Sequence, residues 1–169
     1  MAKSKKIMKT VVIGDSVTGK TCLTERYANG ALPKEYFPTL GSNLGFKDLN
    51  IKGKKAKLII WDLGGSPHFK DVRRSFYRDA VGVVYVFDVT RRETFEHLDE
   101  WRREVAEACG DVPGVIVGNK VDLSPREVRR SEGKRYAESV GMPYIEASAL
   151  TGKNVDKVFR TIASLVAKR

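Results

Sequence analysis

The stretch from Gly14 to Thr21, which reads Gly-Asp-Ser-Val-Thr-Gly-Lys-Thr, constrains the fold of this chain more than any other. It matches the pattern G-x-x-x-x-G-K-S/T, follows an apolar strand-like run over residues 7–13, and precedes a helical pattern that starts near Lys20. Glycines let the backbone turn its N–H groups toward an anion, and the positive end of the following helix points to the same place. The Lys20 ammonium can reach outer phosphates, and the Thr21 hydroxyl can ligate Mg²⁺. A turn with a helix-capping threonine is the alternative, but the spacing favours a polyphosphate site formed by Gly14, Asp15, Ser16, Val17, Thr18, Gly19, Lys20 and Thr21.

The length of 169 residues predicts a single domain over residues 1–169. Lysine and arginine number 31 against 21 acidic residues, and the net charge of +10 favours an acidic partner such as a nucleotide, a nucleic acid, an anionic lipid or an acidic protein face. The sequence shows no secretory signal and no apolar run near the ~20 residues of a membrane span. Cys22 and Cys109 lack the spacing of a metal site or a disulfide framework, which fits a reducing compartment. We expect a cytoplasmic protein.

Strand-like and helical patterns alternate along the chain. Apolar or alternating runs predict strands over 7–13, 43–50, 56–61, 81–87, 114–118 and 143–147, the second and third forming a hairpin. Helical spacing predicts helices over 20–29, from a capping box at Thr90 and Glu93 to Cys109, from a cap at Ser124 and Pro125, and over 155–166. Residues 31–42 and 62–78 have loop composition, and we expect the second of these segments to be mobile. This order predicts an α/β fold of the P-loop NTPase type, with a mostly parallel six-stranded sheet, one antiparallel edge strand and helices on both faces.

Two residues outside the phosphate loop have the chemistry of magnesium ligands. Asp62 directly follows a predicted strand, and the ends of parallel strands meet at one edge of a sheet. A carboxylate there can bind Mg²⁺ on the side opposite Thr21, although a strand-terminal Asp is commonly a turn or N-cap residue. Thr39 lies in a long loop, where its hydroxyl or carbonyl can complete the metal shell. The predicted metal ligands are therefore Thr21, Thr39 and Asp62.

Asn119-Lys-Val-Asp122 follows another predicted strand, and its residue types match the edge of guanine. The Asp122 carboxylate can accept two N–H bonds, the Asn119 amide can serve the N7/O6 side, and Lys120 can lay its stem across the base. Adenine lacks the donor pair that Asp122 would accept, which disfavours ATP. An Asn/Asp-rich turn is the alternative for the tetrapeptide alone. After the last strand, Ser148 would order a loop that offers the Ala149 N–H to the guanine carbonyl.

The order of these motifs resembles that of the Ras-superfamily small GTPases over essentially the whole chain: the phosphate loop, Pro38-Thr39, Asp62-x-x-Gly65, Asn119-Lys-x-Asp122 and Ser148-Ala149. Arg26-Tyr27 and Ser75-Phe-Tyr-Arg78-x-Ala80 are similar to the Rab and Ras branches, whereas Trp61-Asp-Leu-Gly-Gly65 is similar to Arf proteins, so the branch stays open.

This resemblance implies that the chain binds GTP and GDP with Mg²⁺ and has two loops, near residues 36–41 and 63–78, that order on the γ-phosphate. It implies that Thr39 and the Gly65 amide sense the γ-phosphate, and that effector, exchange-factor and activating proteins are partners. The remaining nucleotide contacts that it implies are Cys22, Tyr36, Asn119, Lys120, Asp122, Ser148, Ala149 and Leu150.

The chain departs from the family's pattern at Ser66, which stands where the family has a Gln that orients the attacking water. A serine hydroxyl is too short for that task, so we expect slow hydrolysis of GTP. His68 is a further candidate for positioning water, beside the catalytic set of Lys20, Thr39, Gly65 and Ser66. A partner that inserts an arginine and a switch locked with GTP are the other two interpretations. Leu32 stands where much of the family has an aromatic wall against guanine.

Our leading hypothesis is a GTPase switch with slow hydrolysis, and the main alternative is a GTP-bound scaffold with negligible hydrolysis. A P-loop ATPase or kinase and a nucleic-acid binder are further alternatives. Basic residues cluster over 3–9, 52–57 and 126–135 and at two arginine pairs. Such clusters are usually solvated faces, and they lack the interleaved aromatic residues of a single-strand binder, so nucleic acid is disfavoured. An anionic membrane surface or an acidic partner is the better functional interpretation, and we expect a monomer.

Overall fold

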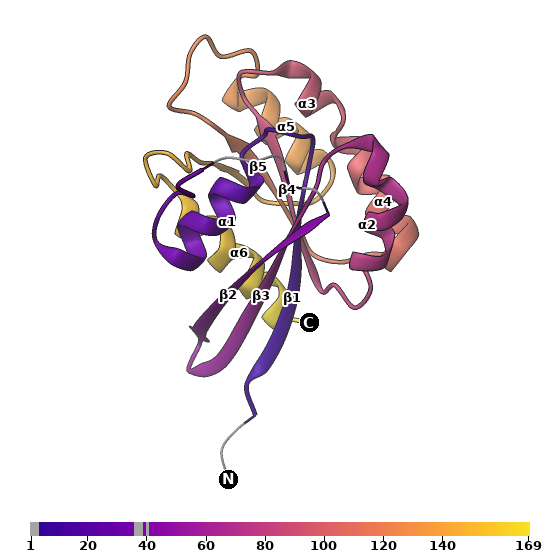
Figure 1. Cartoon of the computed structure of the whole chain (residues 1–169), viewed down its shortest axis with the longest axis vertical. Coiled ribbons are helices and arrows are strands. Elements are labelled where there is room, and N and C mark those ends of the chain that lie inside the picture. Colours follow the sequence, from indigo (N-terminus) through magenta and orange to yellow (C-terminus); the bar gives the residue numbers. More distant parts are fainter. Residues whose placement is uncertain (1–3, 36–38, 40) are drawn as a thin grey trace.

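The computed structural model describes residues 4–35, 39 and 41–169, and their order of elements is the predicted alternation of strands and helices. Figure 1 shows a central twisted sheet with helices on both sides. The strands are β1 (Lys6–Ile13), β2 (Ser42–Ile51), β3 (Lys54–Leu63), β4 (Gly82–Asp88), β5 (Gly114–Asn119) and β6 (Tyr144–Glu146). The helices are α1 (Lys20–Asn29), α2 (Lys70–Phe76), α3 (Arg92–Glu96), α4 (Leu98–Cys109), α5 (Arg130–Ser139) and α6 (Val155–Ala167), with a 3₁₀ turn, η1 (Pro67–Phe69), before α2.

The six strands form one sheet in the order β2-β3-β1-β4-β5-β6. Every pair is parallel except β2 with β3, which form the predicted hairpin. The hairpin turns at Lys52 and Gly53, both with positive φ, so its strands are longer and its turn tighter than the sequence pattern predicts. The predicted α/β fold with one antiparallel edge strand is therefore confirmed. Because the other five strands run parallel, their carboxyl ends lie along the same edge of the sheet.

Two apolar clusters cover the two faces of the sheet. In β4, Val84 and Val86 belong to the cluster formed with α1 and α6, whereas Tyr85 and Phe87 belong to the cluster formed with α4 and α5. This alternation follows from the period of two along a strand, and it explains why β4 reads as a continuous apolar run. Tyr27 of α1 stacks on Phe159 of α6, their ring centroids 4.5 Å apart, so these helices also contact each other.

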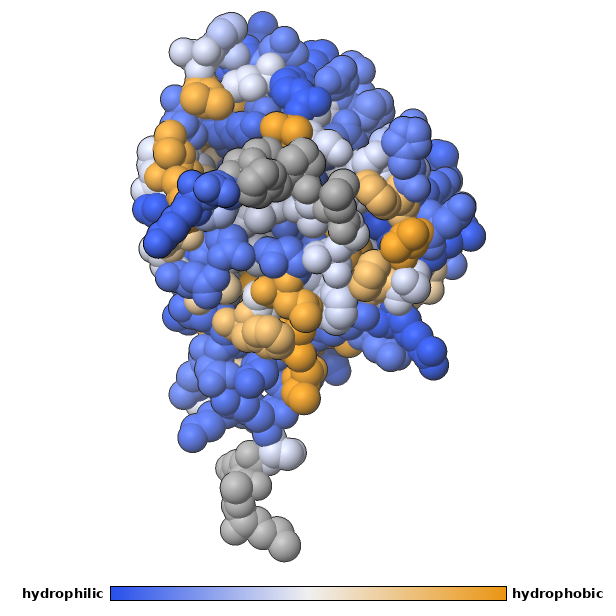
Figure 2. Space-filling model, viewed as in Figure 1, coloured by the Kyte–Doolittle hydropathy of each residue, from blue (hydrophilic) through white to orange (hydrophobic). Residues whose placement is uncertain are grey.

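Part of the sheet surface stays exposed on the β2–β3 wing. Leu44 and Phe46 of β2 retain 43% and 54% of their accessible surface. Figure 2 shows apolar side chains gathered over these strands, beside the hydrophilic end of the hairpin. Among the described residues, no helix combines the length and the apolar character needed to cross a membrane.

Two predicted helix starts are wrong. The Thr90 hydroxyl donates to the Asp88 carboxylate at 2.6 Å instead of capping a helix, and α3 begins at Arg92 without a side-chain cap. The single helix predicted up to Cys109 is divided at His97 into α3 and α4.

The cap predicted at Ser124 and Pro125 is also absent, because α5 begins at Arg130. There the Glu132 carboxylate accepts the Arg129 N–H at 2.8 Å, which satisfies one free backbone donor at the start of the helix. Glu127 accepts the Arg92 N–H at 2.7 Å, so the segment before α5 is tied to α3 instead of forming a helical turn.

Residues 62–78 are more regular than their composition predicts. Asp62 and Leu63 complete β3, and α2 follows the 3₁₀ turn. Ser66 starts this turn because its Oγ accepts the His68 N–H at 3.3 Å, and Pro67 occupies the first helical position, where a missing N–H has no cost.

Candidate nucleotide-binding site

The phosphate loop connects β1 to α1, and its two glycines are required by the space around them. Gly14 has φ +147° and Gly19 has φ +94°, values that L side chains rarely adopt. A Cβ on Gly14 would lie 2.1 Å from the Val86 carbonyl oxygen, and a Cβ on Gly19 would lie 2.2 Å from Asn119 Nδ2. The loop therefore packs directly on β4 and on the end of β5.

Lys20 is buried at the start of α1 and retains 5% of its accessible surface. Its Nζ donates to the Asp15 carbonyl oxygen at 2.7 Å, an oxygen that also accepts the Thr18 hydroxyl at 2.9 Å. Burial lowers the pKa of the Lys20 ammonium to about 8. A buried ammonium that pairs mainly with a carbonyl is costly unless an anion joins it, so this position fits a bound phosphate.

The three predicted magnesium ligands converge next to Lys20. The Thr21 and Thr39 hydroxyl oxygens lie 2.7 Å apart, and the Thr21 hydroxyl donates to Asp62 Oδ2. Asp62 is fully buried, and its Oδ1 finds no hydrogen-bond partner among the residues that the structure describes. Burial raises the pKa of the Asp62 carboxyl to about 6. Two hydroxyls and a carboxylate with a free oxygen form a hard oxygen donor set, which fits Mg²⁺.

The residues predicted to read the base lie at the ends of β5 and β6. Asn119 is buried and donates from Nδ2 to the Thr18 carbonyl at 2.8 Å, while its Oδ1 has no partner within the described part of the chain. Lys120 donates to the Val17 carbonyl at 2.7 Å and pairs with Asp88 at 3.1 Å. These contacts hold the base-side motif directly against the phosphate loop.

Asp122 is exposed and accepts the Ser148 hydroxyl at 2.7 Å. Ser148 also accepts the Thr151 N–H at 3.1 Å, so its hydroxyl joins Asp122 to this loop. Ala149 in that loop is buried, Leu150 is exposed, and Cys22 on α1 is half-buried. Leu32, which stands at the expected base wall, is partly buried against the apolar cluster of α1 and α6.

A cavity of about 370 Å³ joins the phosphate loop to the candidate catalytic residues. Its lining includes Lys20, Thr21, Thr39, Gly65, Ser66 and His68. Gly65 packs so closely on the phosphate loop that a Cβ there would lie 2.3 Å from the Gly14 carbonyl oxygen. The structure thus brings the predicted catalytic set to one cavity, and Tyr36, a predicted nucleotide contact, lies outside the described residues.

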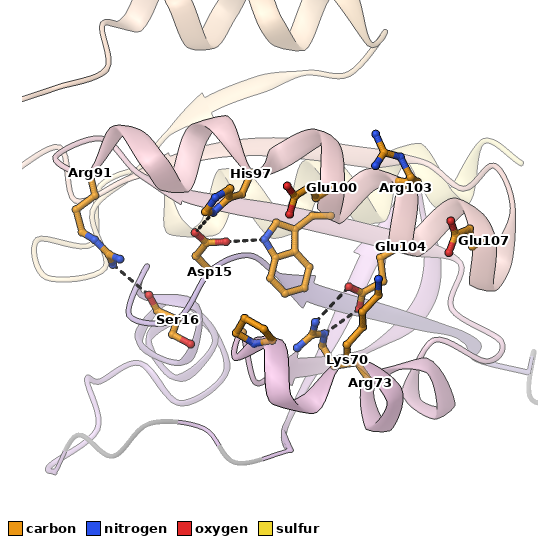
Figure 3. Close-up of a pocket in the computed structure, with 13 residues that line it drawn as sticks. Asp15, Ser16, Lys70, Arg73, Arg91, His97, Glu100, Arg103, Glu104 and Glu107 are labelled. Carbon is orange, nitrogen blue, oxygen red and sulfur yellow. Dashed lines mark hydrogen bonds and ion pairs between the residues drawn. The ribbon is translucent and has the colours of Figure 1, made fainter.

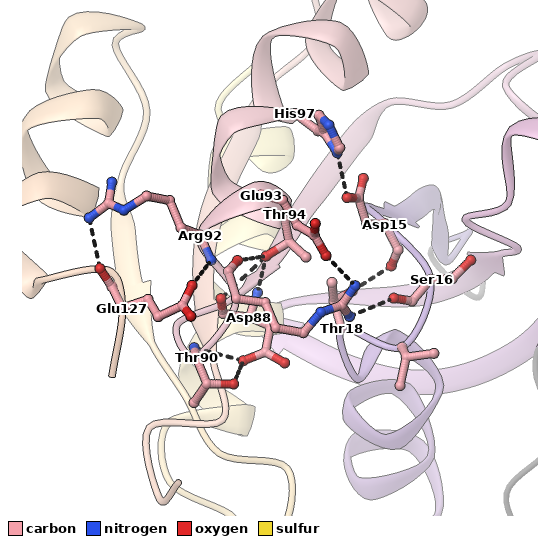
Figure 4. Close-up of polar contacts among 12 residues, drawn as sticks. Asp15, Ser16, Thr18, Asp88, Thr90, Arg92, Glu93, Thr94, His97 and Glu127 are labelled. Atoms are coloured by element: carbon pink, nitrogen blue, oxygen red, sulfur yellow. Dashed lines mark hydrogen bonds and ion pairs between the residues drawn. The ribbon is translucent and has the colours of Figure 1, made fainter. Parts of the chain in front are cut away.

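The sequence analysis missed a polar layer behind the phosphate loop. The Asp15 carboxylate accepts the Trp101 indole N–H at 2.8 Å (Figure 3). It also lies 2.6 Å from His97 Nδ1 (Figures 3 and 4). The hydrogen bond to Asp15 raises the pKa of His97. Arg91 donates to the Ser16 carbonyl at 3.1 Å. More than 70 residues separate these partners in the sequence, so no local pattern connects them.

Comparison with known proteins agrees with this site. A sequence model of the Ras family matches residues 9–168, and the chain belongs to that family. Its members are GTPases that bind GTP and GDP, usually with Mg²⁺, and this chain is accordingly a GTP-binding switch of the small-GTPase class.

The relatives that match the chain are of the Rab type. The chain is 37% identical over 164 residues to the Ras-related protein SEC4 of Saccharomyces cerevisiae, covering 96% of this chain and 76% of that protein. It is 39% identical over 164 residues to the Ras-related protein Rab-26 of Mus musculus, covering 95% of this chain and 63% of that protein. Rab- and Ras-like GTPases generally act through effectors, exchange factors and activating proteins.

Proposed function

We propose that this chain is a guanine-nucleotide switch that holds GTP or GDP with Mg²⁺ and hydrolyses GTP slowly. The observation that carries the proposal is the convergence of buried Lys20 with the oxygens of Thr21, Thr39 and Asp62 at one edge of the sheet. Lys20 would place its charge on the outer phosphates, and the three oxygen donors would hold the metal. Mg²⁺, when bound, neutralises charge on the β- and γ-phosphate oxygens. Asn119 and Asp122 would recognise the guanine edge.

Slow hydrolysis follows from the side chains near Gly65. The Ser66 hydroxyl already accepts the His68 N–H, and it is too short to span an attacking water and the γ-phosphate. The His68 imidazole lines the same cavity and is the further group that we propose for positioning water. The alternative is a GTP-bound scaffold that releases no phosphate on a useful timescale.

Single-turnover hydrolysis of GTP with Mg²⁺ separates these two functions. Ser66→Gln should accelerate phosphate release, because the longer amide can contact both water and phosphate, while Ser75→Gln on the exposed side of α2 serves as the matched control. His68→Ala should slow the residual reaction. Absence of phosphate release over many hours, with candidate activating proteins present, would favour the scaffold.

The nucleotide released on denaturing freshly purified protein tests the same proposal independently. Release of GDP indicates turnover, and release of GTP indicates a stalled switch. Release of no nucleotide indicates that guanine binds weakly because Leu32 replaces the aromatic wall of the base pocket. Competition of ATP against GTP tests the base, and equal competition would support the P-loop ATPase or kinase alternative.

The exposed apolar residues beside the two segments that carry Thr39 and Gly65 support docking of effector, exchange-factor and activating proteins. Leu44 and Phe46 of β2 and Val72 of α2 are exposed, and they flank the segments that carry Thr39 and Gly65. A partner on this surface would sense whether those segments are ordered. The Rab-type relatives support a role in vesicle trafficking. We propose that the protein is a monomer that works in the cytoplasm and at an anionic membrane surface.

A further inference from the structure

We propose that α4 is a clamp that positions both walls of the phosphate site, with Trp101 holding the phosphate loop and Glu104 holding the segment around Gly65 through Arg73. The inference rests on the proposed function, because it concerns how the same site distinguishes GTP from GDP. Arg73 and Trp101 are positioning residues in this scheme, since each acts on the site through other groups.

Arg73 lies on α2 and retains 3% of its accessible surface. Its Nε and Nη2 donate to the two oxygens of Glu104 at 2.8 and 3.2 Å. Its Nη1 donates to the carbonyl oxygens of Gly64 and Ser66, at 2.9 and 2.6 Å. One guanidinium therefore joins α4 to the carbonyls on either side of Gly65.

The hydrogen bond to the Gly64 carbonyl determines the direction of the Gly65 N–H. In a trans peptide the N–H points opposite to the carbonyl of the preceding residue. Because the Gly64 carbonyl points to Arg73, the Gly65 N–H points away from Arg73. Gly65 itself lies against the phosphate loop, within contact of Gly14. Arg73 thus holds the amide that we propose as the γ-phosphate sensor in a fixed orientation.

The other half of the clamp lies one turn earlier on the same face of α4. The Trp101 ring centroid lies 4.5 Å from Arg73 Cζ, and the indole N–H donates to Asp15 Oδ1. The Asp15 main-chain carbonyl accepts the Lys20 ammonium. One series of contacts therefore runs from Trp101 through Asp15 to Lys20. A second series runs from Glu104 through Arg73 to the carbonyls on either side of Gly65.

Glu104, at the α4 end of the clamp, accepts a further side-chain hydrogen bond besides those from Arg73. The buried Tyr77 hydroxyl donates to Glu104 Oε1 at 2.8 Å, so the carboxylate has partners on both oxygens. A buried ion pair is weak evidence for stability, because an apolar pair of similar volume often stabilises a fold equally well. What an apolar pair does not supply is the pair of donors to the Gly64 and Ser66 carbonyls. The arrangement is therefore suited to orienting the site.

The ratio of GTP-analogue to GDP affinity tests the proposal. Arg73→Met keeps an unbranched apolar side chain but removes every donor, and it should weaken binding of a non-hydrolysable GTP analogue by about tenfold while leaving GDP affinity within about twofold. Arg73→Lys should rescue the ratio only in part, because an ammonium lacks the planar fork. Arg74→Met is the matched control, since Arg74 lies on the same helix in an exposed pair with Glu107 and should leave the ratio unchanged.

If Arg73 had only a structural role, Arg73→Met would weaken the binding of both nucleotides equally or not at all. An unchanged ratio of GTP-analogue to GDP affinity in folded Arg73→Met would therefore overturn the inference. If the single variant does not fold, the double variant Arg73→Met with Glu104→Leu removes both buried charges and permits the same measurement. Failure of the unaltered protein to bind any guanine nucleotide would overturn the proposed function and the clamp together. Normal nucleotide binding by the unaltered protein, together with an unchanged affinity ratio in Arg73→Met, overturns the clamp alone.

Discussion

At the scale of single residues, Asp15 has two separate roles in the phosphate loop. Its carbonyl faces the Lys20 ammonium, while its carboxylate points back to His97 and Trp101. The loop is therefore held from behind by side chains that have no contact with the proposed ligand. A proton on His97 adds a positive charge to one of these two contacts.

Stability should depend on pH through His97. Its pKa is raised above the ordinary value of 6.5 by the hydrogen bond and charge of Asp15, with smaller contributions from Glu100 and Glu93. Because the folded state binds the proton more tightly, the stabilisation is fully present below about 6.5 and is lost as the pH rises through the raised pKa. Arg91, Lys70 and Arg103 line one pocket together with His97 (Figure 3), and like charges disfavour a protonated imidazole.

His97→Gln keeps a side-chain donor for Asp15 but does not titrate. We expect the melting temperature of the unaltered protein to fall relative to this variant between pH 6 and pH 8.5. Thermal melts across that range, with Mg²⁺ and GDP held constant, make the measurement. Parallel curves for the two proteins would contradict the prediction.

Base specificity should depend on one carboxylate. Asp122→Asn replaces an acceptor pair with a donor and an acceptor, so it should weaken GTP binding roughly 10- to 100-fold and favour xanthine nucleotides. Competition binding with GTP, XTP and ATP measures the change. Asp99→Asn, an exposed carboxylate on α4, is a suitable control. Retention of full GTP preference by Asp122→Asn would argue that Asp122 does not read the base.

At the scale of elements, α6 supports the sheet beneath the site. Gly82 at the start of β4 lets this helix approach closely, because a Cβ there would lie 2.9 Å from Val166 Cγ2 and 3.0 Å from Ile162 Cγ1. Val158, Phe159 and Ile162 are fully buried against β4 and β5. The apolar stripe of the helix therefore determines how it packs.

Ile162→Ala should lower the free energy of unfolding by about 2–5 kcal/mol, because it removes buried methylene groups and leaves a cavity. Lys157→Ala, which changes an exposed residue of the same helix, should have little effect. Urea denaturation at saturating GDP measures both. A loss below about 1 kcal/mol for Ile162→Ala would mean that the core closes around the space.

At the scale of the whole molecule, the lysines of the hairpin turn and the nucleotide site lie at opposite ends of the sheet. The hairpin turn with Lys52, Lys54 and Lys55 lies beside the start of β1, where Lys6 pairs in register with Ala56. The phosphate loop lies at the other end of β1. An anionic surface could therefore bind the hairpin end without covering the nucleotide site (Figure 1).

Vesicles that contain phosphatidylserine should bind the protein, and added salt should weaken the binding. Charge reversal at Lys52, Lys54 and Lys55 should reduce affinity by about 1 kcal/mol or more per lysine. Charge reversal at Lys134, Lys153 and Lys157, which are also exposed, is the control. It changes the net charge of the protein by the same amount at positions outside the hairpin turn. Equal losses in both triple variants would show that only net charge matters, and RNA binding at physiological salt would favour the nucleic-acid alternative.

The sequence by itself determined the elements and most of the candidate site, because those signals are local. The phosphate loop, the residues after β3 and β5, and the apolar period of α6 can each be read within a few residues, and parallel pairing then brings the strand ends together. The two misplaced helix starts failed because the expected capping groups have other partners. The Thr90 hydroxyl donates to Asp88, two residues away, and Glu127 accepts the Arg92 N–H, 35 positions away.

Only the tertiary structure decided what holds the site from behind. Asp15 meets Trp101 across 86 positions, and Arg73 meets Glu104 across 31, because α2 and α4 pack on the same face of the sheet. No period or motif encodes such a contact, since it depends on the distance and angle between elements that are already folded. The sequence therefore predicted which residues would face the nucleotide, and the packing of α4 determined how they are held.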